Sequence, residues 1–377
     1  MRRSTAFVTL LLLAAFAPRQ ADAGPALVFE LSNSKVLFSE EADDLWYPAS
    51  LTKIMTAYIV FGEIKAGRLG LKSKIACSAA AHTQPPSKIG LPVGGELTLD
   101  KALQALIVKS ANDVAVMLAE AVSGSTEAFV DKMNATAKRL GMERTQFVNP
   151  NGLPAPTQVT TARDLAKLAR AIINEYPEYA HYWTKPEMHL GKIRLASHNG
   201  LLRSFEGADG LKTGFTCDSG FNIVATASRE GRRVVAIVLG DVTSAERNIR
   251  AASLLEHGFQ QQGWKQLFSS TTLDNMPLSA AVPVRSVRKE VTSWGCNEPK
   301  KRKAKPATAA KKTDAKKAVK KEGTAADPSA AAKRAPEGGG ESRPAPITVE
   351  VEAGGRDASS VQLRGTMPPP AAGFQQH

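Results

Sequence analysis

The stretch Tyr47–Ile64 reads YPASLTKIMTAYIVFGEI, and it places Ser50 three residues before Lys53 at the start of an apolar run. Pro48 suits the first turn of a helix, and apolar residues recur at helical spacing after the lysine. Positions i and i+3 of a helix share a face, so the serine hydroxyl and the lysine amine can meet. A lysine that burial keeps neutral can remove the proton of a serine hydroxyl. The pair therefore has the geometry of a nucleophile and its base.

The Ser-x-x-Lys pattern alone is weak evidence, because a chain of this length contains roughly one or two by chance. Two others occur, at Ser32–Lys35 and Ser286–Lys289. The first lies across the turn of an expected hairpin and the second in a stretch rich in Val and Arg, so neither has an apolar helix to hold it. Position in the chain therefore favours Ser50 and Lys53.

Two further patterns supply groups that a serine nucleophile would need. Ser110 and Asn112, in KSAND, lie at an interruption between two expected helices, where polar side chains can enter a cleft. Lys212, Thr213 and Gly214 lie on an expected strand. Lys-Thr-Gly occurs by chance in only roughly one chain in ten of this length. A cation and a hydroxyl at this place can hold an anionic group of a substrate.

The order of the expected elements predicts an α/β fold. Residues 26–41 alternate apolar and polar side chains around Asn33, which is typical of a β-hairpin. A hairpin, helices, antiparallel strands and a last helix together predict one α/β sandwich, an antiparallel sheet flanked by helices to which both ends of the domain contribute. Helices are expected over 48–64, 98–122 with a break at KSAND, 125–141, 160–177 and 248–259, and strands over 210–216, 221–229 and 232–241.

The net charge of +13 is concentrated in one segment. Between Lys300 and Arg343 there are 14 Lys or Arg and 5 Asp or Glu, an excess of nine positive charges. This segment is mostly Ala, Lys, Pro and Gly without aromatic residues, so residues 299–377 are expected to form a disordered tail. Its charge fits either electrostatic contact with an anionic membrane or wall surface, or a solvated spacer. Without interleaved aromatic residues it does not indicate nucleic-acid binding.

Residues 1–23 have the pattern of a secretory signal peptide. Arg2 and Arg3 precede an apolar run from Ala6 to Ala17, and Ala21–Ala23 resembles a cleavage site. The run is too short to cross a bilayer as a helix. The mature chain is therefore expected to be exported to the periplasm or cell envelope.

The cysteine count is odd, with Cys77, Cys217 and Cys296. An exported chain would keep at least one of these thiols free or pair it between chains. A bridge from Cys77 to Cys217 is compatible with an oxidising compartment, and so is a pair of small core residues. The sequence leaves this open.

Taken together and in this order, Ser50-x-x-Lys53, Ser110-Ala-Asn112 and Lys212-Thr213-Gly214 resemble the three signatures of penicillin-binding proteins and serine β-lactamases. The resemblance is closest to the low-mass D-alanyl-D-alanine carboxypeptidases, peptidase family S11, and runs from about Ala26 to Phe259. It extends to the segments YPASLTKIMTAY, IVKSANDVA, VNPNGLP, VTTARDLAKLA and GADGLKTGFT. It implies a β-lactamase/transpeptidase-like fold.

The resemblance also implies an activity: removal of the terminal D-alanine from peptidoglycan stem pentapeptides through an acyl-enzyme. Ser50 would be the nucleophile, Lys53 the general base, and Ser110 a proton relay to the leaving amine. β-Lactams mimic D-Ala-D-Ala and would acylate the same serine. The implied substrate-binding groups are Asn112 for the peptide backbone, Lys212, Thr213, Gly214 and Arg247 around the terminal carboxylate, and the backbone N–H groups of Ser50 and Phe215 for the oxyanion.

The chain is expected to divide into a signal peptide (1–23), a catalytic domain (24–262), a short extension (263–298) and the tail (299–377). Many family members carry a second β-rich domain, for which the extension is too short, so it is interpreted as a reduced remnant. No cofactor or metal is expected, because the six histidines include no His-x-x-x-His pair. Two alternatives remain: a D,D-endopeptidase of the same family, which would cut crosslinks, and a non-catalytic wall-binding protein.

Overall fold

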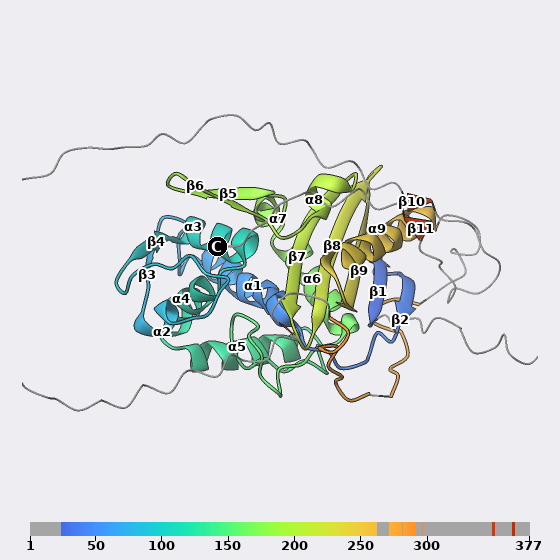
Figure 1. The fold of residues 1–377 in the computed structure, drawn as a ribbon, viewed down its shortest axis with the longest axis horizontal. Coiled ribbons are helices and arrows are strands. Elements are labelled where there is room, and N and C mark those ends of the chain that lie inside the picture. Colours follow the sequence, from blue (N-terminus) through green and yellow to red (C-terminus); the bar gives the residue numbers. More distant parts are fainter. Residues whose placement is uncertain are drawn as a thin grey trace, which may run out of the picture.

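A five-stranded antiparallel sheet crosses the molecule in the order β2-β1-β9-β8-β7 (Figure 1). The structure is a computed structural model that describes residues 24–261, 271–280, 282–291, 296, 349–350 and 364–365. The strand nearest the N-terminus pairs with one of the last strands of the domain, which confirms that both ends contribute to one sheet. The strands are β1 (Ala26–Glu30), β2 (Val36–Glu40), β7 (Ala208–Thr216), β8 (Gly220–Arg229) and β9 (Arg232–Asp241).

Both faces of this sheet are covered by helices. Helix α9 (Ser244–Gln260) packs on one face and helix α6 (Ala162–Glu175) on the other (Figure 1). Side chains alternate across a strand. Leu27 therefore belongs to the large core cluster on the α6 side, whereas Val28 belongs to the smaller cluster under α9. The sequence predicted this layered α/β architecture, and the structure confirms it.

Helix α1 (Thr52–Lys65) is the centre of the helical side of the molecule. Nearly all of its residues are buried, because it packs against α4, α5 and α6. A helix that is apolar all round is a core helix. The other helices are α2 (Ala79–His82), α3 (Leu99–Gln104), α4 (Asn112–Ser123), α5 (Thr126–Arg139), α7 (Ala180–Trp183) and α8 (Leu201–Ser204), with 3-10 turns at Ala49–Leu51 and Pro177–Tyr179 and a π-helical turn at Ala105–Lys109.

The predicted interruption at KSAND is the point where the π-helical turn ends and α4 begins. Helices α5 and α6 begin after the caps Ser125 and Thr161, whose side chains accept hydrogen bonds from the first helical turn. Two short two-stranded sheets were not predicted, one of β3 (Lys74–Ala76) with β4 (Glu96–Thr98) and one of β5 (Glu187–Leu190) with β6 (Ile193–Ala196). Their strands are too short and too exposed to show a clear alternation.

Residues 271–280 and 282–291, here called the strap, contain turns but no helix or strand of their own in these ranges. Arg163 on α6 holds the first part, because its guanidinium pairs with the buried Asp43 (Nε to Oδ1, 2.6 Å) and donates to the Met276 carbonyl at 2.6 Å. Arg288 holds the second part through an ion pair with Asp218 at 2.7 Å. The expected division into domains stays a prediction.

Cys296, beyond the strap in sequence, forms a disulfide with Cys217 in the turn between β7 and β8, and their Cα atoms are 5.4 Å apart. Cys77 is buried with a free thiol. The sequence left open a disulfide between Cys77 and Cys217, and the structure excludes it because Cys217 is bonded to Cys296. The strap brings Cys296 to the turn between β7 and β8, although 79 residues of sequence separate the two bonded cysteines.

The predicted signal peptide, residues 1–23, and nearly all of the predicted tail, residues 299–377, lie outside the described residues. Within the tail, the structure describes only β10 (Val349–Glu350) and β11 (Arg364–Gly365), which pair antiparallel. The expectation of a disordered tail therefore stays a prediction for the remainder. Among the described residues, no helix combines the length and apolarity needed to span a bilayer.

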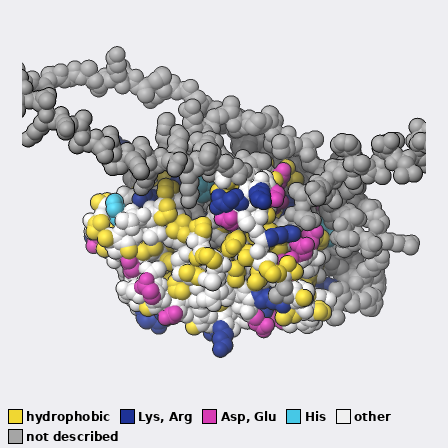
Figure 2. All heavy atoms as spheres, turned by 60° about the horizontal axis from the view of Figure 1, so that its bottom comes forward, with side chains coloured by type: hydrophobic (Ala, Val, Ile, Leu, Met, Phe, Trp, Pro, Cys, Tyr) yellow, Lys and Arg dark blue, Asp and Glu magenta, His cyan; other side chains and the backbone are white. Residues whose placement is uncertain are grey.

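The face of the molecule in Figure 2 carries Lys and Arg side chains interspersed with Asp and Glu, around a broad apolar middle. On this face the charges of the body do not form a basic stripe. This agrees with a sequence in which most of the positive excess lies between residues 300 and 343.

Replacing both Cys217 and Cys296 by serine should lower the free energy of unfolding by about 4 kcal/mol, because a crosslink over 79 residues restricts the unfolded chain by that order. This predicts a fall in Tm of roughly 8 to 16 °C, measured by thermal melting without reductant. A reductant should lower the Tm of the unsubstituted protein and leave that of the double variant unchanged. Equal Tm values without reductant would contradict this account of the strap.

Candidate active site

The buried amine of Lys53 lies at the centre of the predicted site. Its Nζ atom is 3.1 Å from Ser50 Oγ, 2.8 Å from Asn112 Oδ1 and 2.5 Å from the Asn151 carbonyl oxygen. A neutral amine has two N–H donors and one lone pair. The amide and carbonyl oxygens can take the two donors, which leaves the lone pair to accept the serine proton. The structure thus brings Ser50, Lys53 and Asn112 together as predicted.

Electrostatics favour the neutral form of this lysine. Burial lowers the pKa of Lys53 well below its ordinary value, and the nearby cation of Lys212 lowers the pKa further. Asp113 acts in the opposite direction. Because the desolvation effect is the largest, the balance favours the neutral amine that a general base requires.

The turn that carries Ser50 is held between a loop and the edge strand of the sheet. Ala49 has a φ of 47°, which a residue with a side chain seldom adopts. A Cβ atom on Gly152 would lie 1.9 Å from the Ala49 carbonyl oxygen, and one on Gly214 would lie 3.1 Å from the Ser50 nitrogen. Glycine is therefore needed in both places, since β7 and the loop touch the turn through their backbones. Gly214 was predicted as part of the site, and Gly152 was not.

Ser110 and Lys212 form a second contact in the site. Ser110 ends the π-helical turn in the left-handed conformation (φ 61°, ψ 34°), and its Oγ atom accepts a hydrogen bond from Lys212 Nζ at 3.1 Å. Such strained residues are often found at functional sites. Burial, with a contribution from Arg247, lowers the pKa of Lys212 to about 7. Near neutral pH this lysine is poised to gain or lose its proton.

Arg247 lies near Lys212, as the effect on the lysine pKa shows. Its guanidinium is buried, and burial lowers its own pKa to about 10, so it stays charged at neutral pH. It donates to Asn248 Oδ1 at 2.8 Å. Thr213 is buried beside Lys212 on β7, whereas Phe215 is partly exposed and stacks on Phe221 with ring centroids 4.2 Å apart. Lys212, Thr213 and Arg247 are thus buried, and Phe215 is the exposed member of the predicted set on β7 and α9.

A loop over residues 84–90 completes the surroundings of Lys53, and sequence reasoning missed it. Asn112 Nδ2 donates to the Pro85 carbonyl at 3.0 Å. The fully buried carboxylate of Asp113 accepts hydrogen bonds from the backbone N–H groups of Ile89 and Gly90, at 3.0 and 2.8 Å. Asp113 directly follows Asn112 in KSAND. This adjacency to a predicted site residue is the one sequence feature that could have indicated a role for Asp113 near the site.

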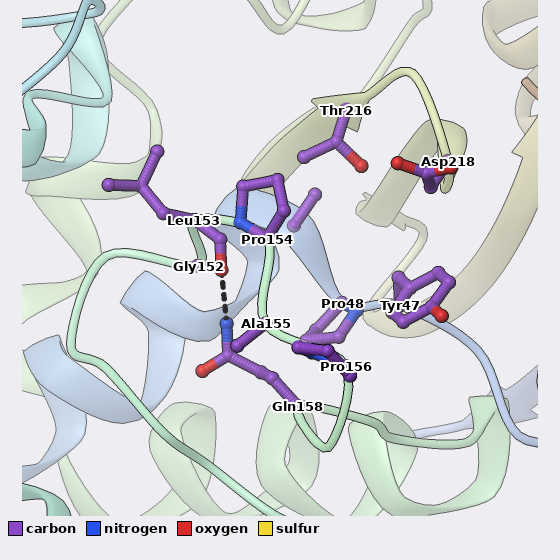
Figure 3. A pocket seen from close by; sticks show the side chains of 11 residues that line it. Tyr47, Pro48, Gly152, Leu153, Pro154, Ala155, Pro156, Gln158, Thr216 and Asp218 are labelled. Carbon is purple, nitrogen blue, oxygen red and sulfur yellow. Dashed lines mark hydrogen bonds between the residues drawn. The ribbon is translucent and has the colours of Figure 1, made fainter.

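A pocket of about 250 Å³ adjoins the turn of Ser50. Leu153 and Pro154 lie on one side of it, and Tyr47 and Asp218 on the other (Figure 3). Ala49 and Thr216 line the pocket as well, so it opens beside the nucleophile and the end of β7. No sequence pattern predicted this pocket.

The described residues contain no group of three or more His, Cys, Asp or Glu side chains that could hold a metal ion. His198 is close enough to Lys212, Lys109 and Arg247 to interact with their charges. Burial and the charges of these three cations lower the pKa of His198 to about 4. This histidine is neutral at physiological pH. The expectation of a metal-free centre stays a prediction.

Comparisons with known proteins agree with this geometry. The model of the D-alanyl-D-alanine carboxypeptidase family, peptidase family S11, matches residues 13–243. The D-alanyl-D-alanine carboxypeptidase DacC of Escherichia coli is 36% identical over 269 residues, which are 68% of this chain and 67% of that protein. DacF of Bacillus subtilis is 33% identical over 245 residues, 64% of this chain and 63% of that protein. The matched region thus spans about two thirds of these relatives.

Solved structures show the same fold. Penicillin-binding protein 5 of Haemophilus influenzae is 32% identical, with a TM-score of 0.61 over 65% of this chain and 72% of that chain. Penicillin-binding protein D2 of Listeria monocytogenes, solved in a cefotaxime-bound form, is 33% identical, with a TM-score of 0.57 over 63% of this chain and 97% of that chain. Hydrogen bonds link Lys53 to Ser50 and Asn112, and Lys212 to Ser110, so the three motifs meet at one site. This chain belongs to the D-alanyl-D-alanine carboxypeptidase family of serine peptidases, the low-mass penicillin-binding proteins.

Proposed function

We propose that the protein is a serine D-Ala-D-Ala carboxypeptidase that removes the terminal D-alanine from peptidoglycan pentapeptides. The observation that carries the proposal is the contact of a fully buried lysine amine with a serine hydroxyl, Lys53 Nζ to Ser50 Oγ at 3.1 Å. A buried amine that favours its neutral form is suited to remove a proton from the hydroxyl.

In the proposed acylation step, Ser50 Oγ attacks the carbonyl carbon of the penultimate D-alanine while Lys53 takes the hydroxyl proton. The backbone N–H groups of Ser50 and Phe215 stabilise the oxyanion. The C–N bond to the terminal D-alanine then breaks, and the leaving amine receives a proton through Ser110. Water next attacks the ester, with the same lysine as base, and releases the shortened peptide with a carboxylate.

The cations on the far side of Ser50 suit the free carboxylate of the substrate. Lys212 and Arg247 are both buried, and each cation is destabilised by loss of solvent. A bound carboxylate would offset this cost and the repulsion between the two side chains. Thr213 adds a hydroxyl on the same strand. This arrangement supports cleavage at the C-terminal residue, with Asn112 binding the substrate backbone.

Similarity supports β-lactams as further ligands of Ser50. The Listeria monocytogenes protein has been solved with cefotaxime bound and with ampicillin bound. We expect the same class of compound to acylate Ser50 here. Slow release of the acyl group is expected, since the Glu-x-x-Asn match of this sequence, Glu30–Asn33, lies at the β1–β2 turn and does not correspond to the segment that speeds deacylation in class A β-lactamases.

The proposed place of action is the periplasm or cell envelope. The disulfide between Cys217 and Cys296 supports an oxidising compartment. The basic tail, residues 299–377, would add electrostatic contact with an anionic membrane or wall surface, which salt should weaken. Membrane or wall association that is insensitive to salt would contradict this role for the tail.

Two alternatives can be separated by product analysis. A carboxypeptidase releases D-alanine from a pentapeptide, whereas an endopeptidase of this family separates a crosslinked dimer into two peptides. A non-catalytic wall-binding protein would do neither. The intact set of Ser50, Lys53 and Ser110 argues against the last alternative, since a binding module has no use for a base beside a serine.

Replacing Ser50 by alanine should abolish both labelling by a fluorescent penicillin and release of D-alanine, because the variant has no oxygen to acylate. Both are measured on the purified mature chain. Ser32→Ala is the matched control, since this exposed serine belongs to another Ser-x-x-Lys pattern and donates to Glu30 Oε1 at 3.4 Å. Labelling that persists in Ser50→Ala would remove Ser50 from the role of nucleophile.

Replacing Lys53 by methionine should lower the acylation rate by about 10² to 10⁴, the usual contribution of a positioned base. Lys65→Met on the same helix is the control, because Lys65 is exposed in the last turn of α1. In the unsubstituted protein, acylation should slow as the pH falls through the lowered pKa of Lys53. A Lys53→Met variant that is acylated at the original rate would contradict the assignment.

The fall of kcat/KM at alkaline pH should report the deprotonation of Lys212. Its pKa of about 7 means that the ammonium form, which attracts the substrate carboxylate, is lost as the pH rises. We expect kcat/KM for a pentapeptide to fall above about pH 7, and Lys212→Arg to move this limb to higher pH because guanidinium stays charged. A pentapeptide amidated at its C-terminus should react more slowly and lack the limb. An alkaline limb unchanged by Lys212→Arg would contradict the role.

A further inference from the structure

Two oxygen atoms determine where the lone pair of the Lys53 amine points. The neutral amine donates its two N–H groups to Asn112 Oδ1 at 2.8 Å and to the Asn151 carbonyl oxygen at 2.5 Å. The lone pair takes the remaining direction, toward Ser50 Oγ at 3.1 Å. If either oxygen moves, the amine can turn away from the hydroxyl. The groups that fix these two oxygens therefore affect how well the amine removes a proton.

Consecutive residues of the loop 84–90 hold both oxygens. The Pro85 carbonyl accepts from Asn112 Nδ2 at 3.0 Å, so the opposite end of that amide, Oδ1, faces the lysine. Gln84 Oε1 accepts from Asn151 Nδ2 at 2.9 Å. One short piece of chain thus contacts both of the residues that accept hydrogen bonds from the amine.

The side chain of Asn151 is committed at both ends. It is buried, its Oδ1 atom accepts from the Leu153 N–H at 3.1 Å, and its Nδ2 atom donates to Gln84. Loss of the Gln84 oxygen would leave a buried N–H group without this acceptor, which is costly unless the loop shifts. Because the carbonyl that contacts the lysine belongs to the same residue, such a shift would move an acceptor of the base.

Gln84 is itself held in one orientation. Its Nε2 atom donates to the Ala80 carbonyl at 3.1 Å, so its Oε1 atom is the end that faces Asn151. Its backbone N–H donates to the Ala81 carbonyl, also at 3.1 Å. The far end of the loop is held by the buried carboxylate of Asp113. The contact between the two amide side chains is therefore fixed before a substrate binds.

We propose that Gln84 is a positioning residue for the general base: it holds the side chain of Asn151, and thereby the carbonyl that keeps the lone pair of Lys53 directed at Ser50. Gln84 acts on the reaction through the lysine. The cations on β7 and α9 that suit the substrate carboxylate take no part in this contact. Its effect should fall on the rate of proton removal and not on substrate affinity. The inference rests on the proposed function and adds a residue to it.

Gln84→Met tests the proposal on the full mature chain, because methionine fills a similar space but has no oxygen to accept from Asn151. We expect kcat and kcat/KM for D-alanine release to fall equally, by about tenfold, the size of effect of one hydrogen bond. KM should change less than twofold, which is the pattern of a group that acts on the transition state alone. The rate constant of acylation by bound benzylpenicillin should fall by the same factor.

Thr83→Ala is the matched control. The Thr83 hydroxyl is next to Gln84 in the chain and donates to the same Ala80 carbonyl, at 3.0 Å, so its loss perturbs the same turn. This variant should keep the original kcat and KM. Equal losses of kcat in Thr83→Ala and Gln84→Met would overturn the proposal, since they would show a general role of the turn. An unchanged kcat in Gln84→Met, or a rise in KM alone, would overturn it as well.

Two further variants separate positioning from loss of structure. Gln84→Glu keeps an oxygen that accepts from Asn151 and should restore acylation to within about threefold of the original rate. The rates are compared on the plateau above the acid limb, because the added negative charge raises the pKa of a nearby lysine. Failure of this rescue would contradict the proposal.

The second variant combines Gln84→Met with Asn151→Ala. It should be no slower than Asn151→Ala alone, because Gln84 acts through that side chain. Independent, multiplying losses would overturn the proposal and leave the proposed function intact. Absence of D-alanine release and of penicillin acylation in the unsubstituted protein would overturn both.

Discussion

The site depends on one amine buried among three oxygen atoms. Lys53 has no exposed surface, and its Nζ atom contacts a serine hydroxyl, an asparagine amide oxygen and a backbone carbonyl. A charged ammonium in this place would lack solvent and face the cation of Lys212. The neutral amine makes the same contacts without that cost. The fold thus produces a base by excluding water from a lysine.

The surroundings of this amine come from distant parts of the chain. Helix α1 supplies the lysine, the start of α4 supplies Asn112, and the loop before residue 152 supplies the Asn151 carbonyl. The edge strand β7 closes the arrangement, since Gly214 lets its backbone touch the turn that holds Ser50. The strap, in turn, holds the β7–β8 turn through Asp218 and a disulfide. Catalytic residues and pocket are therefore positioned by the same packing.

The sequence predicted those parts of the site whose residues lie within a few positions of each other in the chain. Ser50 and Lys53 lie one helical turn apart, and the Ser-x-Asn and Lys-Thr-Gly patterns each fit within three residues, so local spacing is enough to find them. The layered fold could be predicted as well, because the strands are long and apolar. Resemblance to a known family then supplied the roles.

Other parts could not be predicted, since their role arises only in the folded chain. The Asn151 contact uses a backbone carbonyl, which has no side-chain signature. Gly152 matters because Ala49 passes within contact distance, and Cys296 pairs with Cys217 because the strap returns to the sheet. Neither proximity is encoded in a local pattern. The short hairpins at residues 74–98 and 187–196 were missed for a different reason, their exposure.

The central claim is that Lys53 is neutral when the enzyme binds its substrate. Its protonation can be followed directly by NMR of protein labelled with 13C at the lysine Cε position, with Lys53→Met to assign the signal. The account predicts a lysine that titrates well below the ordinary pKa of 10.5 and carries no charge near neutral pH. A Lys53 signal that remains that of a charged ammonium up to about pH 10 would contradict it.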